Sequence, residues 1–153
     1  MPDTELGELI YRLKYRGDQS AVAPIAQAAS GFVKGWKPGI ELIVPVPPSK
    51  SRRVQPLFQI ADEVGNLLNL PVNKESVRKS RTTPELKGVD HAKRLELISG
   101  IHSIEGDALR GLRILLLDDL YQTGATLNAI GRLLKEAGGV SAVFALALTR
   151  ARG

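Results

Sequence analysis

The sequence predicts an α/β protein with a doubly wound, mainly parallel sheet flanked by helices. Two observations lead to this prediction. Amphipathic stretches of helix length alternate along the chain with short runs of valine, isoleucine and leucine, and strands separated by helices favour a parallel sheet. The first of these runs, residues 41–46, is too uniformly apolar for a sheet with one solvent face, which indicates a strand buried on both faces.

Each expected element follows from a local pattern. The first helix rests on Leu6, Leu9, Ile10 and Leu13, which recur at helical spacing. Turn-forming residues, such as Gly138-Gly139 after the last helix, separate the elements. The predicted helices cover residues 6–13, 21–33, 57–68 and 126–137. The predicted strands cover residues 41–46, a short stretch around Val72, and residues 101–104, 113–117 and 140–148.

One segment, residues 75–93, is polar, charged and poor in large apolar side chains. A stretch of that length without a clear element is uncommon in a compact domain and indicates a functional loop or a disordered one. A lid that closes over a substrate and excludes water is one interpretation. A charged loop without a catalytic role is the other.

The most informative motif spans residues 113–126. An apolar strand leads into Asp118 and Asp119, and a short loop with Gly124 then leads into a helix. Ligands of open α/β sheets bind at the carboxyl ends of the strands, and a helix start suits a phosphate. Carboxylates suit sugar hydroxyls, so the motif predicts a phosphorylated ribose as ligand. A solvated turn followed by a helix cap is the alternative.

The stretch Leu-Leu-Leu-Asp118-Asp119-Leu-Tyr-Gln-Thr-Gly-Ala-Thr126 resembles the phosphoribosyl-pyrophosphate motif of type I phosphoribosyltransferases. Three further segments, residues 9–17, 43–47 and 78–94, resemble the ComF-like branch of that superfamily. Two departures stand out. Gln122 replaces a threonine that is common in the family, and the chain lacks cysteine, whereas many ComF-like chains begin with a cysteine-rich zinc module.

The resemblance implies a role for each segment of the site. Asp118 and Asp119 would contact the ribose hydroxyls. The 5-phosphate would be bound by Gln122, Thr123, Gly124, Ala125 and Thr126. The pyrophosphate would be bound by Ser49, Lys50, Ser51 and Arg52, which follow the first core strand. Its departure would be assisted by the catalytic candidates Arg78, Lys79 and Arg81. No protein-held metal is expected, since Mg²⁺ would arrive with the pyrophosphate.

Two functions remain open. The first is a phosphoribosyltransferase of nucleotide metabolism, which transfers the phosphoribosyl group to an unidentified nucleophile, usually a nitrogen base, and releases pyrophosphate. The second is a non-catalytic ComF-like accessory protein in DNA uptake or processing, that is, in competence. Both functions can include a pocket for phosphoribosyl pyrophosphate, whereas only the first includes turnover.

Composition sets the remaining expectations. A chain of 153 residues is most simply one domain, here with a helical hood in residues 1–39 and a core in residues 40–153. The sequence has no apolar run long enough to span a membrane and no signal-peptide pattern, so cytoplasmic location is expected. A net charge of +5 fits a polyphosphate ligand or weak DNA binding. A homodimer is a further open expectation.

Overall fold

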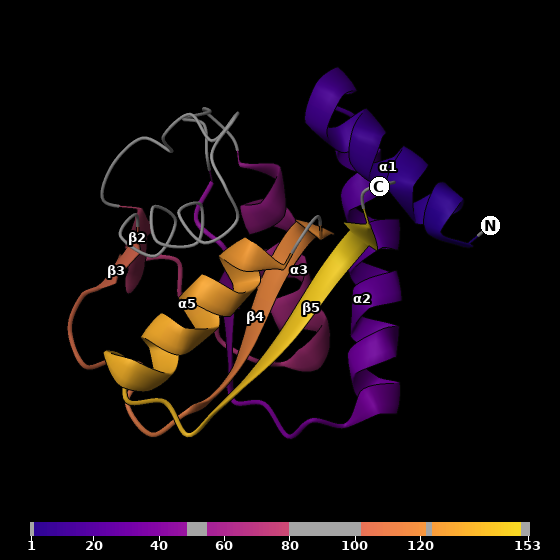
Figure 1. Cartoon of the computed structure of the whole chain (residues 1–153). Coiled ribbons are helices and arrows are strands. Elements are labelled where there is room, and N and C mark those ends of the chain that lie inside the picture. Colours follow the sequence, from indigo (N-terminus) through magenta and orange to yellow (C-terminus); the bar gives the residue numbers. More distant parts are fainter. Residues whose placement is uncertain (1, 49–54, 80–101, 122–123, 151–153) are drawn as a thin grey trace.

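The computed structural model describes residues 2–48, 55–79, 102–121 and 124–150. Its main sheet has three parallel strands in the order β1-β4-β5 (Figure 1). These strands are β1 (Leu42–Pro45), β4 (Arg113–Tyr121) and β5 (Ala142–Arg150). The helices are α1 (Pro2–Arg16), the short 3₁₀ turn η1 (Gln19–Ala21), α2 (Val22–Trp36), α3 (Pro56–Leu68) and α5 (Ala125–Glu136).

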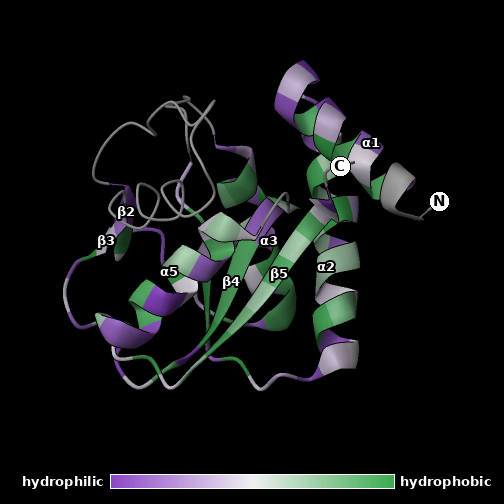
Figure 2. Ribbon diagram, viewed as in Figure 1, coloured by the Kyte–Doolittle hydropathy of each residue, from purple (hydrophilic) through white to green (hydrophobic). Residues whose placement is uncertain are grey.

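The central strand β4 is buried on both faces over its apolar part, residues 114–117. Successive side chains of a strand point to opposite faces. Leu115 and Leu117 belong to one core cluster, while Ile114 and Leu116 belong to another, and all four are fully buried. The apolar colouring of β4 and β5 in Figure 2 reflects this position. The sheet is therefore the middle layer of the molecule.

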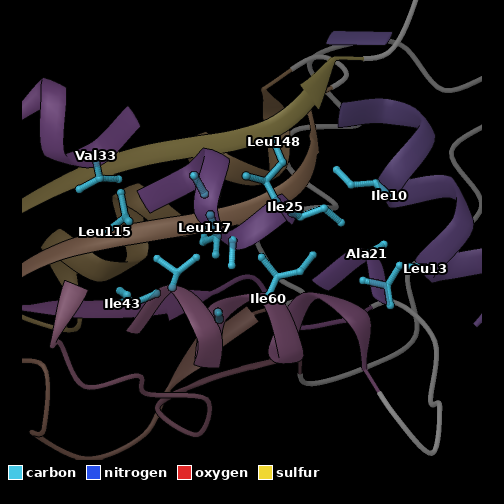
Figure 3. Packing of buried hydrophobic residues seen from close by; sticks show 14 residues of the cluster. Ile10, Leu13, Ala21, Ile25, Val33, Ile43, Ile60, Leu115, Leu117 and Leu148 are labelled. Atoms are coloured by element: carbon cyan, nitrogen blue, oxygen red, sulfur yellow. The ribbon is translucent and has the colours of Figure 1, made fainter. Parts of the chain in front are cut away.

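Helices cover both faces of the sheet, which confirms the predicted fold class. The first core cluster joins α1, α2 and α3 to one face, and Figure 3 shows Ile25 of α2 and Ile60 of α3 converging on Leu117. The second cluster joins Ile130 and Leu134 of α5 to the other face. Since α2 contributes to the same core as the sheet, the expected division at residue 39 stays a prediction.

The motif strand is longer than predicted. The sequence indicated an end at Leu117, but β4 continues to Tyr121. The reason is tertiary, because β5 runs alongside and keeps the register past the acids, with Asp118 opposite Ala147 and Leu120 opposite Thr149. Asp118 and Asp119 therefore lie within a hydrogen-bonded strand, and pairing with a neighbour fixes their backbone.

Part of the segment expected to lack regular structure forms a small hairpin. Strand β2 (Val77–Lys79) pairs antiparallel with β3 (His102–Ile104). The prediction of a structureless stretch over residues 75–93 is therefore wrong at Val77–Lys79, because Val77 and Ile104 join the core beside α5. The strand expected around Val72 is reduced to an isolated parallel bridge with Ile43. Residues 80–93 lie outside the described part of the chain.

None of the helices in the described ranges has the length and apolarity needed to cross a lipid bilayer.

Candidate functional site

The site is built at the carboxyl edge of the parallel sheet, where β4 leads toward α5. Side-chain alternation places Asp118 on the α5 side, in line with Ile114 and Leu116. Asp119 lies on the opposite side, in line with Leu115 and Leu117, where the N-terminal helices pack. The two acids thus leave the strand on different sides, and their carboxyl groups still lie close enough to interact.

Asp118 is in an unusual electrostatic environment for a carboxylate. Burial raises its pKa from the ordinary 3.8 to about 7, and the negative charge of Asp119 raises the pKa further toward that value. A hydrogen bond between the Asp118 and Asp119 side chains raises the pKa of Asp118 as well. The backbone N–H of Asp119 donates to Asp118 Oδ1 at 2.8 Å, which favours the ionised form but does not offset these three causes. A buried acid with a strongly raised pKa at a sheet edge is a typical functional-site candidate.

Asp119 has a cationic partner that the motif does not reveal. Lys14 Nζ of α1 lies 2.8 Å from Asp119 Oδ2. The hydroxyl of Thr149 on β5 donates to the backbone carbonyl of Asp119. The sequence indicated Lys14 only as part of a family-like segment, because nothing in residues 9–17 shows which sheet residue they meet.

Gly124 forms the junction between the β4 loop and α5. It is the N-cap residue of α5, with φ 78°, in the left-handed region that glycine adopts at no steric cost. Ala125 and Thr126 form the first turn of the helix, and that turn contains no acidic side chain. The start of α5 therefore presents backbone N–H groups and the positive end of the helix dipole, which suits an anion.

A second feature of the same edge is a cavity of about 340 Å³ beyond the end of β1. Because β1 runs parallel to β4 with Pro45 opposite Leu117, residues that follow β1 lie at the same edge as Asp118. The lining includes apolar Pro47, Pro48 and Phe58 and the cationic Lys74, Arg78 and Lys79.

The cationic side chains of this cavity differ in exposure and in the groups that they contact. Arg78 is exposed and its Nε lies 3.2 Å from Glu105 Oε2. Lys74 Nζ lies 2.7 Å from Asp62 Oδ2. Lys79 lies opposite His102 in the hairpin, and partial burial lowers its pKa. Burial lowers the pKa of His102 as well, with a further contribution from the charge of Lys79.

The structure describes some of the predicted site residues. Asp118 and Asp119 lie in the last part of β4, and Gly124, Ala125 and Thr126 lie at the start of α5. Arg78 and Lys79 line the cavity beyond β1. The remaining candidates lie outside the described residues: Ser49, Lys50, Ser51, Arg52, Arg81, Gln122 and Thr123. Within the described residues, no group of three or more histidine, aspartate or glutamate side chains has a metal-binding arrangement.

Comparison with known proteins agrees with this architecture. No protein-family model matches the chain. It is 30% identical over 151 residues to the competence protein ComFC of Bacillus subtilis, and the match covers 94% of this chain. The chain spans 59% of the length of that relative.

Two solved structures with the same fold are adenine phosphoribosyltransferases. The enzyme from Thermoanaerobacter pseudethanolicus has a TM-score of 0.59 at 22% identity, covering 88% of this chain and 70% of that chain. The enzyme from Saccharomyces cerevisiae has a TM-score of 0.60 at 17% identity, covering 88% of this chain and 71% of that chain. The chain therefore has the phosphoribosyltransferase fold, and most of its length is similar in sequence to a ComF-type competence protein.

Proposed function

We propose that the protein binds phosphoribosyl pyrophosphate at the carboxyl edge of its sheet and transfers the phosphoribosyl group to a nucleophile. The observation that carries the proposal is the carboxylate pair Asp118–Asp119, fixed on β4 immediately before the start of α5. Carboxylates accept hydrogen bonds from sugar hydroxyls, and a helix start binds phosphate. A ribose 5-phosphate needs both kinds of group a few ångströms apart.

The two acids have distinct parts in this proposal. Asp119 is already paired with Lys14, so it presents a carboxylate whose charge is offset. Asp118 is buried with a pKa of about 7, so it is protonated in a large share of molecules at neutral pH. Ribose hydroxyls would donate to its ionised form, and ligand binding is then expected to strengthen as pH rises through 7.

The reaction would break the bond between the anomeric carbon and the pyrophosphate oxygen. The pyrophosphate leaves with the electron pair of that bond, and the lone pair of the acceptor, usually a nitrogen, forms the new bond to the carbon. Positive charge develops on the sugar while negative charge develops on the leaving group. Lys79 and Arg78 would offset the latter, together with the residues after β1. A Mg²⁺ ion would arrive on the pyrophosphate oxygens, which it prefers as ligands.

The binding step is tested by calorimetry with phosphoribosyl pyrophosphate on the wild type and on the double variant Asp118→Asn, Asp119→Asn. Binding is expected in the wild type and lost in the double variant, whose circular dichroism stays that of a folded protein. Asp107→Asn is the control, since Asp107 is an exposed acid outside the site. Equal affinity in the double variant would remove the assignment.

Turnover is tested by measuring pyrophosphate release with a panel of purine and pyrimidine bases. Release with one base and not with the others would identify the acceptor class. The similarity to a competence protein favours a second candidate, an accessory protein in DNA uptake or processing. Binding of phosphoribosyl pyrophosphate without release on any base would favour that function.

A further inference from the structure

We propose that Lys14 is a positioning residue of the ribose site, which acts through Asp119 and links helix α1 to ligand binding. The inference rests on the proposed function, because Lys14 contacts Asp119, which is one of the two acids proposed to bind the ribose. It starts from an ion pair across layers, between the last turn of α1 and the carboxyl edge of β4.

The pair has the geometry of a close, charge-assisted hydrogen bond. Its N–O distance is 2.8 Å, and the side chains of Lys14 and Asp119 are only 23% and 20% exposed. Ion pairs on an open surface contribute little and constrain little. This one is mostly shielded from solvent, so it restricts the rotamer of the Asp119 side chain and holds its oxygen on the α1 side of the sheet.

Lys14 is presented by a well-anchored helix end. Leu13 and Ile10 are buried in the core, and Figure 3 shows Leu13 beside Ala21 and Ile10 near Ile25 and Leu148. Leu13 thus packs α1 against η1, and Ile10 packs α1 against α2 and β5. Helix α1 can therefore hold the ammonium group of Lys14 in one place.

The turn after α1 adds a second anchor. Arg12 donates to Asp18 Oδ2 through Nε at 2.9 Å and Nη2 at 2.7 Å. The backbone N–H of Asp18 donates to the Arg12 carbonyl at 3.0 Å. Gly17 between them has φ 64°, a conformation that glycine adopts without strain and that commonly ends a helix. This turn defines where the last turn of α1 stops.

Electrostatics explains why the site needs this cation. Two adjacent carboxylates repel each other, and the raised pKa of Asp118 reflects that repulsion together with burial. Lys14 offsets the charge of Asp119, so it reduces the repulsion felt by Asp118. Without Lys14, Asp118 would hold its proton to higher pH, and fewer molecules would present the two carboxylates that ribose hydroxyls require.

Among the described residues, the other charged groups near the pair are accounted for. On α1, Arg12 is engaged by Asp18 and Arg16 lies over the ring of Tyr11. On β5, the hydroxyl of Thr149 contacts the backbone of Asp119, and Arg150 is exposed at the end of the strand. The first turn of α5 has no acid. Among these described residues, Lys14 is therefore the cation that contacts the Asp119 carboxylate directly.

A purely structural role is the competing explanation, in which Lys14 only ties α1 to the sheet. The two explanations differ in what they predict for pH. A structural tie predicts a lower melting temperature in Lys14→Met without a change in the pH at which the ligand binds. A positioning role predicts that this pH rises.

The experiment measures ribose 5-phosphate binding by calorimetry between pH 5.5 and 8.5, in the wild type, Lys14→Met and Lys14→Arg. In Lys14→Met the midpoint is expected to rise by about one pH unit, which weakens binding about tenfold below the midpoint. Lys14→Arg keeps the charge and should restore the wild-type midpoint. Because the wild type and both variants receive the same ligand, the titration of the ligand's own phosphate cancels from the comparison.

Two controls make the result specific. Lys14→Met introduced into Asp119→Asn should weaken binding no further, because the double-mutant cycle removes the partner through which Lys14 acts. Arg12→Met loosens the end of α1 without removing the Lys14 charge, and should lower the melting temperature without moving the midpoint. A midpoint that shifts equally in Arg12→Met and Lys14→Met would overturn the proposal. So would a loss of affinity for phosphoribosyl pyrophosphate but not for ribose 5-phosphate, which would place Lys14 on the pyrophosphate instead.

Failure of the proposed function is recognised separately. Carboxyl carbon NMR of the ligand-free protein reports the titration of Asp118 directly. If the wild type binds no ribose 5-phosphate, the proposed function fails, while an upward shift of the Asp118 titration in Lys14→Met would still show the electrostatic link. If the wild type binds but that titration is the same in Lys14→Met and the wild type, the proposal for Lys14 fails alone.

Discussion

Replacing Asp118 with asparagine is expected to stabilise the fold and, at the same time, to weaken ligand binding. The folded protein raises the pKa of Asp118 from 3.8 to about 7, chiefly through burial and the neighbouring Asp119 charge. Between these two values the folded state holds a proton that the unfolded chain has released, so the free energy of unfolding falls as pH rises through the interval. Above pH 7 the full cost of the buried charge is present.

The magnitude follows from the size of the shift. A rise of about three pH units corresponds to about 4 kcal/mol at about 1.36 kcal/mol per unit. Asp118 lies beside a second carboxylate and retains some solvent contact, so about half of that, ~2 kcal/mol, is the expected gain in Asp118→Asn at pH 8. Asparagine keeps an oxygen that accepts from the Asp119 N–H. For a domain of this size the gain corresponds to a rise of roughly 4–8 °C in melting temperature.

The assay is thermal unfolding of wild type and Asp118→Asn at pH 4 and pH 8. The melting temperatures of the two proteins should differ at pH 8 and converge at pH 4, where the wild-type Asp118 carboxyl is largely protonated in the folded state. The control Asp107→Asn changes an exposed acid and should stay within about 0.5 kcal/mol at both values. A lower melting temperature for Asp118→Asn than for the wild type at pH 8 would refute the reasoning that the buried charge of Asp118 destabilises the fold.

Three further predictions concern the loop, the core and the second candidate function. Gly124→Ala should lower the free energy of unfolding by about 1–2 kcal/mol because φ at this position is 78°, and it should weaken ribose 5-phosphate binding. The control Gly31→Ala lies on an open helix face and should stabilise the fold by up to about 1 kcal/mol. Equal melting curves for the two variants would contradict this prediction. Leu117→Ala should cost about 2–5 kcal/mol in urea unfolding, since Leu117 is fully buried, while Leu67→Ala, 39% exposed, should cost much less. Single-stranded DNA should bind weakly, lose affinity with salt and be displaced by phosphoribosyl pyrophosphate, and tight binding at physiological salt that the ligand does not affect would put the accessory function first.

The sequence was sufficient for the fold class and for placing the acids toward the carboxyl end of a core strand. The apolar run at residues 41–46 is uniform enough to indicate burial on both faces, and helical stripes between the strands indicate crossover connections. Local chemistry also indicated a loop with Gly124 before a helix from Thr126, and the observed helix begins one residue earlier, at Ala125. These features depend on neighbours in the sequence, and the periodicity of side chains reports them directly.

Only the tertiary structure decided where β4 ends, that Val77–Lys79 forms a strand and which residue forms an ion pair with Asp119. Strand length depends on a partner, and β5 carries β4 past the acids to Tyr121. The hairpin of β2 and β3 joins segments more than 20 residues apart in the chain, and the contact between Lys14 and Asp119 spans more than 100. Such pairings carry no local periodicity, because they arise from which faces the packed core brings together. The raised pKa of Asp118 has the same origin, since burial and a neighbouring charge exist only once the sheet and helices have assembled.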